Sequence, residues 1–198
     1  RNAALSFSAA ECFVKGISAE GGLFVPQEFP KISLEKIALM ADKSYSERAF
    51  DVLSCYLTDF SEAELKACIS GAYGTKFDDE KIVPLHYLND CAVLELFHGP
   101  TLAFKDMALQ MLPHFLTCAR GKVGEKYKTL ILVATSGDTG KAALEGFCDV
   151  DGVSIAVFFP NQGVSKMQQA QMTTQEGKNV FVCAVNGNFD DAQTGVKQ

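Results

Sequence analysis

Residues 129–160 read TLILVATSGDTGKAALEGFCDVDGVSIAVFFP, in which two apolar runs flank a segment with helical spacing. The same alternation continues to the end of the chain. We predict strands at Leu130–Ala134, Val153–Phe159 and Val180–Val185, and helices at Lys141–Cys148, at Ser165–Glu176 and from near Phe189. The strand runs are continuously apolar, which is typical of parallel strands buried on both faces. The predicted fold class is therefore α/β, with an open parallel sheet flanked by helices.

The first strand-to-helix turn is Thr135-Ser136-Gly137-Asp138-Thr139-Gly140, which we call the 135–140 turn. In open α/β sheets, ligands bind at the carboxyl ends of strands, where helix N-termini offer unpaired N–H groups. The turn is thus a candidate anion cradle, although its spacing matches neither GxGxxG nor a Walker loop. A turn that only caps the following helix explains the same composition.

The next two turns are weaker candidates. Ser165 and Gln168 can form a capping box, and Lys166 can point at an anion held by the neighbouring turn, although a solvent-exposed lysine is the simpler interpretation. Asn186–Asp191 invites comparison with a glycine-rich phosphate loop, but its aspartates would repel a phosphate and suit the first turn of a helix. We therefore predict no cofactor-phosphate loop in these 198 residues.

Lys105 lies in the stretch LFHGPTLAFKD, residues 96–106, among apolar residues and where a loop is expected to become a helix. Apolar surroundings disfavour the ammonium form of a lysine, which makes its amine a better nucleophile that can form Schiff bases. A lysine that snorkels from the first turn of an ordinary helix fits the local sequence as well. Helical spacing continues from Met107 to Ala119, with a kink or an end expected at Pro113.

Residues 1–88 are predicted to form a mostly helical cap, and residues 89–198 the α/β domain that carries the lysine. Helices are expected at Leu34–Ala41 and after the capping residues Ser44 and Ser61. Short strands or extended segments are expected at Ala4–Phe7, Leu23–Val25, Ile82–Leu85 and Cys91–Leu96.

Composition excludes several classes of function. Net charge is −6 and the basic residues are scattered, so neither a nucleic-acid nor a membrane surface is indicated. There is no long apolar run or signal-peptide pattern, so we expect a soluble cytoplasmic protein. The seven cysteines contain no CxxC pair and are expected to be reduced core residues, and the three isolated histidines suggest no metal site. Because the first residue is Arg1, we expect a segment of a longer protein.

Several motifs together resemble the threonine synthase family of the bacterial and fungal type. They are LELFHGPTLAFKD at 94–106, ATSGDTG at 134–140, GGLFVP at 21–26 and GNFDD at 187–191, and they match in order as well as in sequence. The resemblance covers essentially the whole chain. It implies a pyridoxal-phosphate (PLP) enzyme with the tryptophan-synthase-β type of fold, fold type II. Such an enzyme converts O-phospho-L-homoserine and water into L-threonine and phosphate.

The resemblance also implies roles for individual residues. Lys105 would be the Schiff-base lysine that carries the cofactor and later moves protons. The substrate carboxylate would be held by Thr135, Ser136, Gly137, Asp138 and Thr139. Asp138 would also face the cofactor ring hydroxyl, where most relatives of this fold have Asn. Asn161 and Lys166 are candidate ligands of the substrate phosphate.

The family also requires a glycine-rich loop for the cofactor phosphate and a hydroxyl partner for the pyridine nitrogen. Neither is found in these residues, so the segment alone is expected to bind PLP weakly and to be inactive. Two alternatives stay open: a phospholyase acting on another phosphorylated amino compound, and a non-catalytic anion-binding module in which Lys105 is structural. The sequence indicates no oligomeric state.

Overall fold

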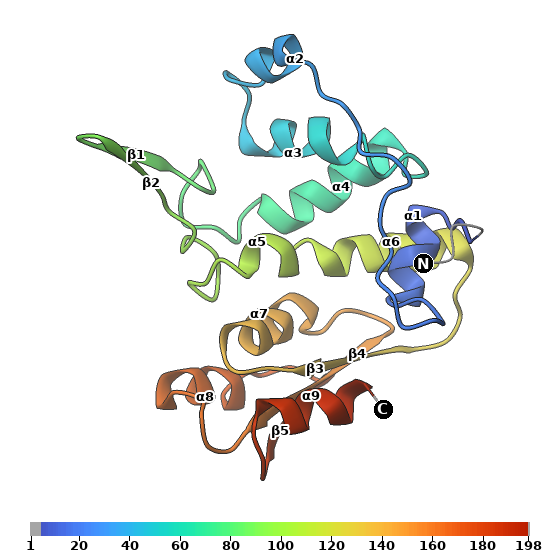
Figure 1. The fold of residues 1–198 in the computed structure, drawn as a ribbon, viewed down its shortest axis with the longest axis vertical. Coiled ribbons are helices and arrows are strands. Elements are labelled where there is room, and N and C mark those ends of the chain that lie inside the picture. Colours follow the sequence, from blue (N-terminus) through green and yellow to red (C-terminus); the bar gives the residue numbers. More distant parts are fainter. Residues whose placement is uncertain (1–4, 198) are drawn as a thin grey trace. The chain divides into compact units, whose positions relative to one another are not determined.

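The computed structural model describes residues 5–197, which divide into two compact units (Figure 1). The first contains the described residues up to Thr75 together with His114–Lys126, and the second contains Lys76–Pro113 and the described residues from Tyr127 onward. The expected boundary after residue 88 differs from this division. Residues 76–88 belong to the second unit, and a helical segment after Pro113 belongs to the first.

The first unit is helical, as predicted. Its helices are α1 (Ala9–Lys15), α2 (Leu34–Leu39), α3 (Tyr45–Leu53), α4 (Glu62–Tyr73) and most of α6 (Leu112–Val123). Ser44 and Ser61 form the predicted capping boxes of α3 and α4, in which each serine hydroxyl accepts the N–H of a glutamate that bonds back to the serine backbone. The capping signals in the sequence therefore located these helix starts.

The N-terminal residues differ from the expectation of short strands. Leu5–Phe7 and Leu23–Val25 form no strand, and Ala4 lies outside the described residues. The intervening segment contains α1, which the sequence interpretation missed. Ser8 and Glu11 form a third capping box at its start, so the signal was present in the sequence.

Aromatic side chains from three elements form part of the core of the first unit. The ring of Phe13 lies 6.1 Å from that of Phe60 and 5.2 Å from that of Phe115, and the last two rings are 5.9 Å apart. Rings at these separations contribute attraction beyond their burial. The same packing joins α1 to α6 and explains why α6, although distant in sequence, belongs to this unit.

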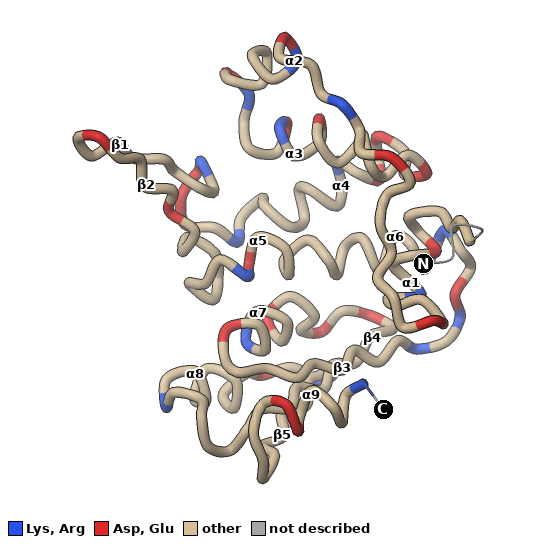
Figure 2. The backbone as a smooth tube through the Cα atoms, in the orientation of Figure 1, with Lys and Arg blue, Asp and Glu red and all other residues tan. Residues whose placement is uncertain are grey.

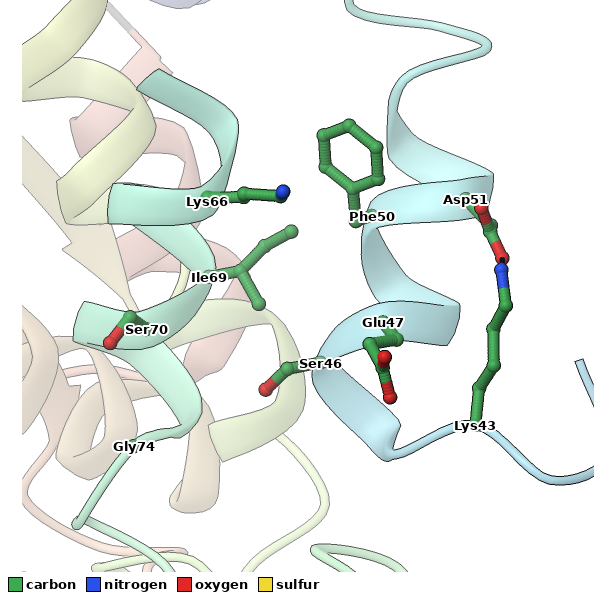
Figure 3. A pocket seen from close by; sticks show the side chains of 9 residues that line it. All are labelled: Lys43, Ser46, Glu47, Phe50, Asp51, Lys66, Ile69, Ser70 and Gly74. Atoms are coloured by element: carbon green, nitrogen blue, oxygen red, sulfur yellow. Dashed lines mark hydrogen bonds and ion pairs between the residues drawn. The ribbon is translucent and has the colours of Figure 1, made fainter. Parts of the chain in front are cut away.

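A groove of about 490 Å³ lies between α3 and α4 (Figure 3). Both of its lysines have acidic partners, since Lys43 bonds Asp51 at 2.5 Å and Lys66 bonds Glu62 at 2.6 Å. The Lys66 ammonium also lies 5.4 Å from the centre of the Phe50 ring. No residue of the predicted site lines this groove.

The second unit contains the predicted parallel sheet. Its strands are β3 (Thr129–Ala134), β4 (Val153–Pro160) and β5 (Val180–Val185), hydrogen-bonded in the order β3-β4-β5. Both pairs are parallel. The connecting and following helices are α7 (Asp138–Phe147), α8 (Lys166–Thr173) and α9 (Phe189–Lys197). The predicted fold class is therefore confirmed.

Helices cover the two faces of the sheet unequally. Two successive right-handed crossovers in the same direction place α7 and α8 on one face. Every second residue of β4 is almost fully buried, namely Val153, Ile155, Val157 and Phe159. Helix α9 contacts β3 and β4, the two strands that α7 also contacts. Because α7 covers one face of these strands, α9 lies on the opposite face. The intervening residues of β4 are only half-buried.

A separate hairpin precedes Lys105. Strands β1 (Leu85–Leu88) and β2 (Cys91–Leu94) pair antiparallel around a turn at Asn89-Asp90. The first strand begins after Pro84 instead of containing it, which is consistent with the missing N–H of proline. Neither strand joins the parallel sheet.

The cysteines are less buried than predicted. All seven are free, but only Cys68 is buried, whereas Cys91 and Cys183 are exposed. In the part of the chain that the structure describes, no helix is long and apolar enough to cross a membrane.

Candidate active site

A buried carboxylate organises the loop that precedes Lys105. Asp106 is fully buried and accepts hydrogen bonds from the backbone N–H and the hydroxyl of Thr101, both at 2.8 Å. Bonds to a charged acceptor are stronger than neutral ones. Asp106 therefore fixes the loop five residues before it and, through the chain, its neighbour Lys105.

The same loop contains two conformational constraints. Leu102 has φ +61°, a left-handed conformation that is costly for a residue with a side chain. A Cβ at Gly99 would lie 2.5 Å from Asp106 Oδ2, so only glycine leaves room for the buried carboxylate. Strain and close approach at one loop are typical of functional sites.

Lys105 is the N-cap residue of a short helix, α5 (Asp106–Leu109). Its side chain is half-buried, and its ammonium lies 4.7 Å from the centre of the Phe104 ring. Within residues 5–197, no ion pair of Lys105 with a carboxylate is found. The amine is thus held near an aromatic surface without an acidic partner.

The helical segment is interrupted near Pro113, as predicted. It consists of two helices, since α5 ends at Leu109 and α6 begins at Leu112. Proline has no N–H for the carbonyl four residues earlier, and its ring excludes the regular helical path. A Cβ on Gly146 of α7 would lie 2.1 Å from that carbonyl oxygen, on Leu109. The end of α5, the helix that follows Lys105, is therefore packed closely against α7, the helix that follows the 135–140 turn.

Thr135 shapes the 135–140 turn from within. It is buried, and its hydroxyl accepts the N–H groups of Gly137 and Gly140 at 3.0 and 2.9 Å and donates to the Gly137 carbonyl. This hydroxyl is therefore engaged within the turn. The contact with the substrate carboxylate that the sequence suggested for Thr135 stays a prediction.

The remaining residues of the turn present polar groups outward. Gly137 is the N-cap of α7 and supplies no side-chain cap. The Thr135 hydroxyl accepts the Gly140 N–H, so the N–H groups of Asp138 and Thr139 are the ones left without a capping side chain. Ser136 and Asp138 are exposed, and Thr139 is half-buried. The turn thus combines unpaired N–H groups with hydroxyls, which is the composition of an anion cradle.

The structure also connects this turn to the next one. The side-chain amide of Gln168, on α8, donates to Asp138 Oδ1 at 2.7 Å and accepts from the Ser165 hydroxyl at 2.9 Å. Ser165 caps α8 as predicted, but Gln168 reaches across to α7 instead of closing a capping box. The exposed Lys166 is the first residue of α8.

Asn161 follows β4 directly and has an exposed side chain. Its backbone N–H donates to the carbonyl of Val185 at 2.9 Å. Its placement at the carboxyl end of β4 is the expected one for a ligand-binding residue of a parallel sheet.

A histidine that the sequence interpretation left without a role lies in the same loop as Lys105. His98 Nδ1 is 2.6 Å from Asp78 Oδ1, and His98 Nε2 is 2.7 Å from Glu95 Oε2. Hydrogen bonds that the His98 ring donates to the carboxylates of Glu95 and, next in effect, Asp78 raise the pKa of His98 above its ordinary value. The imidazolium therefore ties residues 76–79 to the motif, and Asp78, twenty positions away, could not be paired with it from sequence spacing.

The Asn186–Asp191 turn does not offer a phosphate site. Asn188 Oδ1 accepts the N–H groups of Asp190 and Asp191, and Asp191 Oδ2 accepts the N–H of Asn188. The donors that would bind a phosphate are thus used within the turn. This geometry agrees with the prediction that the turn only starts a helix.

Comparisons with known proteins find matches in sequence and in structure. A family model described as "Threonine synthase N terminus" matches residues 1–73. A threonine synthase of Schizosaccharomyces pombe is 44% identical over 207 residues, which cover 100% of this chain and 40% of that protein. Threonine synthase-like 1 of Homo sapiens is 39% identical, over 96% of this chain and 26% of that protein. The crystal structure of a PLP-bound threonine synthase from Brucella melitensis matches with a TM-score of 0.86 at 39% identity, over 96% of this chain and 41% of that one.

The parallel sheet, its helices and the structural match define the fold as that of fold type II PLP enzymes. Over its whole length the chain is similar to the N-terminal portion of threonine synthases. It spans about two fifths of the length of the fungal relative, and about a quarter of that of the human one.

Proposed function

We propose that the protein, in its full length, is a PLP-dependent threonine synthase, which converts O-phospho-L-homoserine and water into L-threonine and phosphate. The observation that carries the proposal is the setting of Lys105. Its amine has no carboxylate partner among the described residues, and the buried pair Asp106 and Thr101 fixes the loop before it. An exposed, solvated lysine would need no such support.

The residues present fit one part of a PLP site. Lys105 would hold the cofactor through its amine, which the described structure leaves without an ion pair. Asp138 would lie at the cofactor ring hydroxyl. Bound PLP supplies an electron sink that stabilises carbanions of amino acids. The sequence predicts no loop for the cofactor phosphate in these 198 residues, so we expect the 198-residue chain alone to bind PLP weakly and not to turn over.

The 135–140 turn would bind the substrate carboxylate. The N–H groups at the start of α7 and the hydroxyls of Ser136 and Thr139 are donors, and the positive end of the helix favours an anion there. Thr135 and Gly137 would act by shaping this cradle. Asn161 and Lys166 would contribute to binding of the substrate phosphate from the neighbouring turn.

Lys105 would also move protons. With the substrate in place, the Lys105 amine would take a proton from one substrate carbon and return it at another. Proton transfer by a positioned side chain accelerates reactions by about 10²- to 10⁴-fold. The anchored loop before Lys105 limits the positions that the amine can take.

A second enzymatic function is favoured by one of the similarities. Threonine synthase-like 1 is as similar in sequence to this chain as the Brucella melitensis threonine synthase is. A phospholyase acting on another phosphorylated amino compound would use the same lysine and the same carboxylate cradle. The alternative outside enzymology is an anion-binding module in which Lys105 is structural.

Replacement of Lys105 separates these possibilities. In the full-length protein, Lys105→Ala should abolish the visible absorption of lysine-bound PLP and lower threonine formation by at least about 10²-fold, the lower limit for a lost proton-transfer group. Lys178→Ala, at an exposed lysine, is the matched control. Phosphate release from O-phospho-L-homoserine without threonine would favour a different phospholyase. Ligand binding without any PLP absorption in the wild type would favour the module.

A further inference from the structure

The Gln168 side chain joins the two turns of the candidate site. Its Nε2 donates to Asp138 Oδ1 at 2.7 Å, its Oε1 accepts from the Ser165 hydroxyl at 2.9 Å, and its backbone N–H donates to that same hydroxyl oxygen at 3.2 Å. Three residues from two helices thus form one continuous chain of hydrogen bonds. Gln168 itself does not belong to either turn.

The chemistry of the partners fixes the orientation of the Gln168 amide. The Ser165 oxygen already accepts the backbone N–H of Gln168, so its proton is available to the amide oxygen. The amide NH₂ group therefore faces Asp138. A carboxylate accepts hydrogen bonds but donates none when it is ionised, so this arrangement is complementary to the charged form of Asp138.

Steric packing restricts the same contact. A Cβ on Gly137 would lie 2.4 Å from Gln168 Nε2, and Gly137 has φ +154°. The glutamine amide thus lies directly over the α-carbon that begins α7. A side chain at position 137 would therefore displace the amide from its place beside Asp138.

We propose that Gln168 is a positioning residue, which holds the Asp138 carboxylate at the N-terminus of α7 and couples the 135–140 turn to the start of α8. The inference rests on the proposed function for the role of Asp138, but the contact itself can be tested without it. Without Gln168, the Asp138 side chain is free to rotate among its rotamers, and the spacing between the two turns is no longer fixed.

The other charged groups on the two helices are accounted for. Lys141 bonds Glu145 at 3.1 Å and also bonds the side chain of Gln175. Lys166 is exposed at the first position of α8. A negative charge introduced at residue 168 would therefore repel mainly the carboxylate of Asp138, which is the hydrogen-bond partner of Gln168.

The contact is tested first in the 198-residue chain by NMR. The side-chain amide protons of Gln168 should be shifted from the values of free glutamine and protected from exchange. Asp138→Ala should return them to free values, whereas Asp138→Asn, which keeps the acceptor oxygen, should preserve them. Free-glutamine behaviour in the wild type would overturn the proposal, whether or not the protein makes threonine.

The role in the reaction is tested in the full-length protein with Gln168→Glu, which keeps the shape but places a second carboxylate beside Asp138. We expect kcat to fall roughly 10- to 100-fold at neutral pH, by analogy with the loss of a partner that orients a metal ligand. Activity relative to wild type should recover as pH falls, because a protonated glutamate again donates a hydrogen bond. Gln168→Ala should be impaired at every pH.

The control is Gln169→Glu, the same substitution one position along α8, where the described structure records no side-chain hydrogen bond. It should match wild type in kcat and in pH profile. Melting temperatures confirm that each variant is folded. Wild-type activity of Gln168→Ala, or a Gln168→Glu profile parallel to that of wild type, would overturn the positioning role. Failure of the wild type to form threonine would instead overturn the proposed function.

Discussion

The hydrogen bond between Thr101 and Asp106 is open to a quantitative test by a double-mutant cycle. Thr101→Val keeps the shape of the side chain and removes its hydroxyl, while the backbone N–H still donates to Asp106. Asp106→Asn keeps the volume but removes the charge, and its amide oxygen can satisfy only some of the donors. One substitution removes the hydroxyl donor of the Thr101–Asp106 hydrogen bond, and the other removes the charge of its acceptor.

The magnitude follows from burial and geometry. The two oxygen atoms are 2.8 Å apart and Asp106 is fully buried. A hydrogen bond to a charged group contributes about 1.5–3 kcal/mol to stability. Thr101→Val should thus lower the free energy of unfolding by about 1.5–3 kcal/mol, and Asp106→Asn by about 2–4 kcal/mol, because it also leaves a donor unsatisfied. The double mutant should lose less than the sum, with a coupling of about 1–2 kcal/mol.

Urea unfolding followed by far-UV circular dichroism measures these differences, since the chain has no tryptophan to report by fluorescence. Leu102→Gly is a useful companion, because it relieves the left-handed backbone without touching the carboxylate. It should be neutral or slightly stabilising. A coupling below about 0.5 kcal/mol between the two main substitutions, the usual error of additivity, would refute the view that Asp106 anchors the loop through this hydroxyl.

Two further predictions concern pH and packing. The pKa of His98 is raised in the folded state, so its stabilising contribution is fully present below the unfolded value near 6.5 and is lost as pH rises through the higher folded value. Urea midpoints measured from pH about 6 to pH about 9 should therefore fall less steeply in His98→Gln than in wild type, and equal slopes would contradict the ion-pair assignment. Gly71→Ala places a Cβ 2.4 Å from the His114 ring and should cost about 1–3 kcal/mol in unfolding free energy. Gly121→Ala is also in a helix but has no atom near its Cβ, so it should raise the free energy of unfolding by up to about 1 kcal/mol. If both substitutions changed stability in the same direction, packing around the new Cβ would not decide whether stability rises or falls.

Periodicity and capping signals predicted most elements of this fold because they are local. Three parallel strands and the helices between them follow from apolar runs and turns within some sixty residues. Pro113 was correctly expected to interrupt a helix, since its effect depends only on its own ring. The capping box at Ser8 was missed because the surrounding apolar residues were interpreted as strands, although the S-x-x-E spacing was visible.

The division into compact units was less predictable from sequence. Helix α6 directly follows the lysine-bearing segment, and nothing in its own pattern shows that it packs with α1 and α4. That membership depends on aromatic contacts such as the one between Phe13 and Phe115, which are about a hundred residues apart in the chain. Amphipathic spacing identifies a buried face, but it does not identify the partner of that face.

The candidate site shows the same limit at the level of single residues. Composition singled out every polar residue of the 135–140 turn, but it could not separate an exposed hydroxyl from a buried one that bonds within the turn. Thr135 and Ser136 are neighbours with the same functional group, yet one is buried among backbone donors and the other is exposed. Gln168 shows the converse. Its spacing from Ser165 predicted a local cap, and only the parallel alignment of β3 with β4 brings it to Asp138, thirty residues away. A residue that positions another is therefore found from the fold, whereas the residue it positions is found from the motif.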